Sequence, residues 1–127
     1  MAANPFETYQ SINKEGMSQR ELEASVLTKA GLLLKNCQEN WNANDRDFQL
    51  DEAIKYNQKI WSFFQAELSS PDNPMPKNLR EDILSLSLFI DKRLFDVMAY
   101  PSPEKLTTVI NINFNLAAGL RTGPASP

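Results

Sequence analysis

The chain has 127 residues, of which 42% are hydrophobic and 23% are charged, and these proportions fit one globular domain. Its net charge of −3 disfavours broad nucleic-acid binding, because an acidic surface is repelled by phosphate backbones. Histidine is absent and Cys37 is the single cysteine, which excludes an internal disulfide and removes the commonest metal ligand and general base. We therefore expect no enzymatic activity, no metal, no cofactor and no small-molecule substrate.

The first 17 residues, "MAANPFETYQSINKEGM", are predicted to form an N-terminal arm. They are polar apart from isolated apolar residues such as Phe6, Tyr9 and Ile12. They lack the basic start and the apolar core of a secretory signal. No apolar run in the chain is long enough to span a membrane. We therefore expect a cytoplasmic protein that does not contact membranes.

The first long helix is predicted to begin at Ser18, because Ser18 and Glu21 match the S-x-x-E pattern of a capping box. Its apolar residues recur at helical spacing and include Leu22, Val26, Ala30, Leu33 and Cys37. Cys37 lies within this stripe and is predicted to be a core residue. After the loop "NANDRD", a second helix is predicted over residues 47–68, with an apolar face wider than a core-facing surface helix needs.

The stretch "SSPDNPMP" is predicted to separate the second helix from a third over residues 76–100. Pro71 and Pro74 cannot continue a helix, whereas Pro76 suits a first helical position. So short a connection favours an antiparallel hairpin. The third helix carries two apolar stripes on roughly opposite sides, Leu79, Ile83, Leu86, Ile90, Leu94 and Val97 on one and Leu84, Leu88 and Phe95 on the other. Such a helix is either central in a bundle or covered by a partner.

The stretch "PSPEKL" is predicted to break the chain again and to start a fourth helix, with Ser102 as its N-cap and Pro103 at its first position. Its stripe consists of Leu106, Ile110, Asn113, Ala117 and Leu120. Gly119 or Gly123 is expected to end it, and residues 122–127 are expected to form a flexible tail. The chain is therefore predicted to be an all-α, single-domain bundle of about four helices over residues 18–121.

Two sets of residues are candidates for partner binding. Asn57 and Asn113 each lie inside an apolar stripe, where a buried amide needs hydrogen-bond partners. They either fix the register between helices or contact the backbone of a partner in a groove. The residues that exceed one core face are Tyr56, Phe63, Leu84, Leu88 and Phe95. They either complete the core or form a recognition surface, in which aromatic side chains are enriched.

The central stretch "YNQKIWSFFQAELSSPDNPMPKNLREDILSLSLFI" resembles the signature of the FlaF family, flagellar biosynthesis regulators of alphaproteobacteria. The matching residues are Trp61, Glu67, Leu68, Pro71, Asn73, Pro76, Leu79, Arg80, Ile83, Ser85 and Leu86. Tyr9 and Gln10, the segment "RELE" from Arg20 to Glu23, and the closing "INFNLAAGLR" also resemble the family. The resemblance covers residues 9–121 and departs at Phe89, where the family often carries tryptophan.

The resemblance implies a cytoplasmic protein that promotes flagellin synthesis and secretion, in concert with the regulator FlbT. Because the chain is acidic, it is a poor candidate for direct RNA binding. Flagellin itself is therefore the expected partner, taken up as a helical segment by a chaperone-like module. The alternative is a post-transcriptional regulator of flagellin translation that acts with FlbT or on flagellin mRNA.

Overall fold

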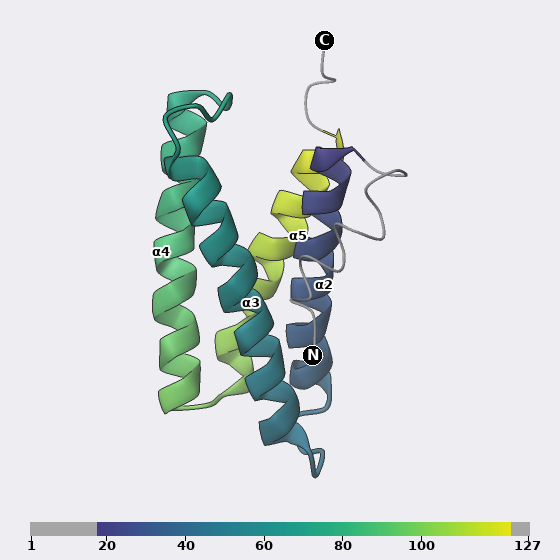
Figure 1. Cartoon of the computed structure of the whole chain (residues 1–127). Coiled ribbons are helices and arrows are strands. Elements are labelled where there is room, and N and C mark those ends of the chain that lie inside the picture. The colour runs from purple at the N-terminus through teal and green to yellow at the C-terminus, as the bar shows by residue number, and fades with distance from the viewer. Residues whose placement is uncertain (1–17, 123–127) are drawn as a thin grey trace, which may run out of the picture.

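The computed structural model describes residues 18–122, which form helices arranged as Figure 1 shows. The predicted arm (residues 1–17) and all but the first residue of the predicted tail lie outside the described residues. α2 spans Gln19–Glu39 and begins at Ser18 as predicted. The Oγ of Ser18 accepts from the backbone N–H of Glu21 at 3.1 Å, and the Glu21 carboxylate accepts from the Ser18 N–H at 3.3 Å. The capping box is therefore complete at both of its bonds.

The remaining elements are helical as well, so residues 18–122 contain no strand and the all-α prediction is confirmed. They are α3 (Arg46–Ser69), α4 (Lys77–Ala99), the 3-10 turn η1 (Pro103–Leu106) and α5 (Thr107–Thr122). Three details differ from the sequence prediction. Pro76 is the N-cap of α4, with extended ψ, and not its first helical residue. Ser102 and Pro103 are the N-cap and the first position as predicted, but of a 3-10 turn and without a side-chain capping bond. α5 continues through Gly119 to Thr122, and Gly123, the other predicted end, lies outside the described residues.

α3 lies between α2 and α4 and packs on both, while α5 packs most extensively on α2 (Figure 1). α3 and α4 run antiparallel, since Gln58 contacts Met98 while Gln65 donates to Asp91 at 2.9 Å, two turns further along α3. The core draws on all four long helices, and its fully buried residues include Leu27, Leu34, Ile60, Trp61, Ile90, Leu94 and Val109. Burying these large apolar side chains is the dominant favourable term in folding.

The loop between α3 and α4 is held by its own side chains. The Asn73 amide donates to the Glu67 carbonyl at 3.0 Å, and its oxygen accepts from the Met75 N–H at 2.9 Å. The Arg80 guanidinium donates to the Ser70 carbonyl at 3.3 Å. The same two carbonyls also accept from backbone N–H groups, Glu67 from Ser70 at 3.3 Å and Ser70 from Asn73 at 3.1 Å, so several bonds converge on the end of α3 and fix the direction in which α4 returns.

α4 is an edge helix, which decides one alternative that the sequence left open. It packs on α3 and touches η1, and its contacts with α2 and α5 are at most marginal. The helix with two apolar stripes is therefore not central in the bundle. Two residues of its predicted core stripe are consequently part-exposed, Leu79 at 46% and Leu86 at 38%. No helix among residues 18–122 has the length and apolar composition to cross a membrane.

Candidate functional site

Asn57 and Asn113 meet in the centre of the bundle. The Asn113 amide donates to the side-chain oxygen of Asn57 at 2.7 Å, and the oxygen of Asn113 accepts from the indole N–H of Trp61 at 2.9 Å. The Asn57 amide donates to the backbone carbonyls of Ala30 at 3.0 Å and Ala53 at 2.9 Å. One chain of hydrogen bonds thus joins α2, α3 and α5.

Neither asparagine reaches the surface, since both side chains are fully buried. Both N–H groups of the Asn57 amide have partners within the chain, and so do the oxygens of both amides. Buried polar groups that are satisfied in this way fix the register of the helices that carry them. The structure places both amides inside the bundle, bonded to each other and to neighbouring helices.

Tyr56 and Phe63 lie on the side of α3 that faces α2. Tyr56 is only 7% exposed, and the Lys29 ammonium of α2 lies 5.1 Å from the centre of its ring. Phe63 follows two helical turns later on the same side of α3 and is half-buried, with its ring edge-on to Phe64 at 5.7 Å. Most of the surface of these two aromatic rings is therefore already used inside the domain.

Leu84, Leu88 and Phe95 lie together on a different surface, which we call the outer stripe of α4. Their spacing places them on one side of the helix. Leu88 and Phe95 are each 63% exposed, and Leu84 is half-buried. The sequence left open whether the five apolar candidates line one groove or two separate faces. The structure divides them between two faces of the α3–α4 hairpin.

A second apolar surface was not foreseen from the sequence. It consists of the exposed Leu79 and Leu86 of α4, whereas Phe89 of α4 and Ile112, Leu116 and Leu120 of α5 are part-buried and pack against the core. The two helices meet near η1, where the Arg93 guanidinium donates to the Lys105 carbonyl at 3.1 Å. They diverge away from η1 (Figure 1). Only the tertiary arrangement reveals this surface, because Leu79 and Leu86 share their stripe with true core residues.

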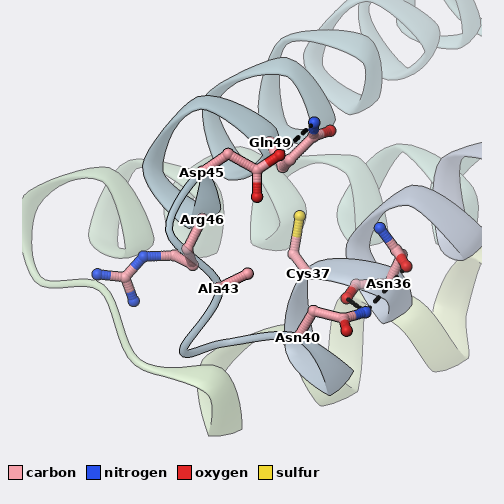
Figure 2. A pocket seen from close by; sticks show the side chains of 7 residues that line it. All are labelled: Asn36, Cys37, Asn40, Ala43, Asp45, Arg46 and Gln49. Carbon is pink, nitrogen blue, oxygen red and sulfur yellow. Dashed lines mark hydrogen bonds between the residues drawn. The ribbon is translucent and has the colours of Figure 1, made fainter.

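A hollow of about 330 Å³ lies where α2 ends and α3 begins (Figure 2). The Cys37 sulfur points into it, with Asn36 and Asn40 on one side and Asp45 and Gln49 on the other. The polar groups pair with each other, Asn40 to Asn36 at 3.0 Å and Gln49 to Asp45 at 3.1 Å. Burial raises the pKa of the Cys37 thiol, and the charge of Asp45 raises it further. The thiol is therefore poorly placed to act as a nucleophile.

Near the start of α2, the half-buried carboxyl of Glu23 has a shifted pKa. Burial raises this pKa, a hydrogen bond from Gln19 lowers it, and the charge of Glu67 raises it. Within residues 18–122, no three His, Cys, Asp or Glu side chains lie close enough together to hold a metal ion.

These features define an all-α protein in which an edge helix exposes apolar side chains and a buried amide pair joins the other helices. Residues 5–120 match the family model described as flagellar protein FlaF. Because this match covers most of the chain, the protein belongs to the FlaF family and is a flagellar protein. No curated protein and no solved structure shows significant similarity to it.

Proposed function

We propose that this flagellar protein binds flagellin in the cytoplasm, as a chaperone-like module that promotes flagellin synthesis and secretion. The observation that carries the proposal is the outer stripe of α4. Two of its three side chains are 63% exposed, on a helix at the edge of the bundle. Apolar side chains gathered on one side of an exposed helix are typical of protein interaction sites.

The outer stripe has the dimensions that a helical partner requires. Leu84 and Leu88 are one turn apart, and Phe95 follows two turns later, so the stripe runs for roughly 17 Å along α4. The exposed charged residues Glu81 and Lys92 border it on the same helix. An apolar centre with a charged rim is the usual composition of an interface that takes an amphipathic helix.

Isothermal titration calorimetry with purified flagellin tests this proposal. Phe95→Ala and Leu88→Ala shorten exposed side chains, so each changes the free energy of unfolding by less than about 0.5 kcal/mol. If the stripe binds flagellin, we expect Phe95→Ala to weaken binding by about 2 kcal/mol or more, roughly thirtyfold in Kd. The chain offers matched controls on other surfaces, Phe48→Ala at 63% exposure and Leu32→Ala at 54%, which are expected to bind as the native protein does.

The outcomes distinguish an error in the proposed binding surface from an error in the proposed function. Equal binding by the Phe95 and Phe48 variants shows that flagellin uses another surface. The absence of flagellin binding by the native protein overturns the proposed function itself. Binding to flagellin mRNA that falls steeply with added salt supports the alternative, translational regulation through RNA, because contacts to phosphate release counterions.

A further inference from the structure

The outer stripe of α4 belongs to a regular seven-residue repeat. Leu88 and Phe95 are seven residues apart, and so are Asp91 and Met98, which lie on the same side of the helix. Together with Leu84 they alternate at spacings of four and three, the pattern by which one helix packs along another in a coiled coil. We call these five residues the heptad seam. Leu88 and Phe95 are each 63% exposed and Met98 is 52% exposed, so most of its apolar area is open to a partner.

Asp91 is the one charged residue of the heptad seam, and only part of its carboxylate is paired within the domain. Its Oδ2 accepts from the Gln65 amide of α3 at 2.9 Å, and this bond restricts the orientation of the carboxylate. Its Oδ1 has no hydrogen-bond or ion-pair partner among residues 18–122. A wholly apolar helix laid along the seam would therefore remove a carboxylate from water without pairing it, which is costly.

We propose that the helix bound by the heptad seam carries a lysine or arginine opposite Asp91, with apolar residues at its neighbouring seam positions. The proposal rests on the proposed function, because it names the chemistry of the flagellin segment that the outer stripe takes up. The cation pairs with Asp91 while the apolar neighbours cover Leu88 and Phe95. A single polar position in an apolar seam fixes the register of the two helices, so Asp91 selects one segment and rejects those with an acidic or apolar residue there.

A second copy of the chain does not supply this cation. Between Leu84 and Met98 its own seam carries no charged residue except Asp91. A parallel pair of copies would bring the two Asp91 carboxylates together, and an antiparallel pair would set each of them against Leu88 or Phe95 of the other copy. Either arrangement leaves a carboxylate in the seam without a cation in the seam opposite it, so a different helix with a basic residue is the better occupant.

Two synthetic peptides measure this preference without flagellin. Both are amphipathic helices about three heptads long with leucine at the seam positions, and they differ only in lysine or glutamate at the central one. We expect the lysine peptide to bind the full-length protein at least about tenfold more tightly than the glutamate peptide, measured by fluorescence anisotropy.

Three variants assign the preference to Asp91. Asp91→Asn removes the charge but keeps an acceptor for Gln65, and is expected to abolish the difference between the peptides. Asp82→Asn makes the same change at an exposed position on another side of α4, and is expected to preserve it. Phe95→Ala is expected to weaken both peptides by a similar factor, which locates them on the heptad seam.

Several results would overturn the proposal. They are a lack of binding by either peptide, equal binding of the two peptides to the native protein, and a preference that Asp91→Asn leaves unchanged. A native protein that sediments as a dimer, and as a monomer after Phe95→Ala, would also overturn it, because a second copy is then the occupant.

Titration with flagellin distinguishes this preference from the proposed function. We expect Asp91→Asn to weaken flagellin binding by about tenfold and Asp82→Asn to leave it unchanged. Equal binding of flagellin to the native protein and to Asp91→Asn would overturn the pairing with Asp91 and leave the proposed function intact. A lysine peptide that binds in an Asp91-dependent way, beside flagellin that does not bind, would overturn the proposed function and retain the preference of the seam for a cation.

Discussion

Gly31 of α2 lies so close to Phe114 of α5 that a Cβ on Gly31 would be 2.5 Å from Cε1 of the ring. We expect Gly31→Ala to lower the free energy of unfolding by about 1 kcal/mol. Overpacking against the ring costs about 1–3 kcal/mol, and the higher helix propensity of alanine offsets about 1 kcal/mol of this. Gly119→Ala is the matched control, with no atom within 4 Å of its Cβ, and is expected to stabilise by up to about 1 kcal/mol. Urea denaturation measures both, and two stabilised variants would contradict the close approach.

The buried amide pair makes a second prediction. Asn113→Ala removes the acceptor of the Trp61 indole and the donor to Asn57, and leaves both groups unpaired in the core. We expect it to lower the free energy of unfolding by at least about 2 kcal/mol, measured by chemical denaturation. Asn111→Ala, at an exposed position of the same helix, is expected to change it by less than about 0.5 kcal/mol. Similar losses in the two variants would show that the hydrogen bonds contribute little.

Glu23 predicts a pH dependence of stability. Its pKa is raised above 4.5 in the folded state, chiefly by burial, so the folded chain holds this proton more tightly than the unfolded chain. Stability from this group is therefore full at low pH and is lost as the pH rises through the raised pKa. Glu23→Gln is expected to stabilise the protein at pH 7 by less than about 1 kcal/mol, because solvent partly screens the group. In thermal melts, the advantage is expected to vanish below pH 4.5, and an advantage at every pH would point to another cause.

The thiol of Cys37 provides a fourth prediction. Because burial and Asp45 raise the pKa of the thiol, little thiolate is present at neutral pH, and Cys37 is 3% exposed. We expect Ellman's reagent to react with the folded protein at least about tenfold more slowly than with the protein in urea. A cysteine introduced at the exposed residue Ser62 provides the reference rate. Equal rates at the two positions in the folded protein would show that the hollow admits the reagent.

Features that depend on nearby residues were predictable from the sequence. The capping box of Ser18 and Glu21 and the break at "SSPDNPMP" arise from contacts between residues a few positions apart, and both are present in the structure. Pro76 was misplaced by one position, since the same fixed φ suits an N-cap and a first helical residue, and only the extended ψ of 141° separates the two. Local chemistry therefore determined the elements, with errors of a residue or two at their ends.

The partners of the stripes were not predictable, because they depend on distant parts of the chain. Asn113 bonds to Asn57, 56 positions earlier, and periodicity alone names no partner for either amide. The two stripes of α4 have similar spacing, so the sequence cannot say which side α3 covers. Leu86 and Leu88 belong to different stripes and both are exposed, because α4 lies at the edge of the bundle.

The pairing of α2 with α5 has a consequence for the nascent chain. α2 is the first described helix to be synthesised, and it packs most extensively on α5, the last one. The hydrogen bond between Thr28 and Arg121 likewise joins residues 93 positions apart. Until α5 has been synthesised, the leucines of α2 that pack on it stay exposed to solvent. Closing a loop over such a separation costs conformational entropy before the contacts contribute any stabilisation. The packing of α2 on α5 therefore cannot form before α5 has been synthesised, and shorter nascent chains expose apolar surface of the kind that chaperones bind.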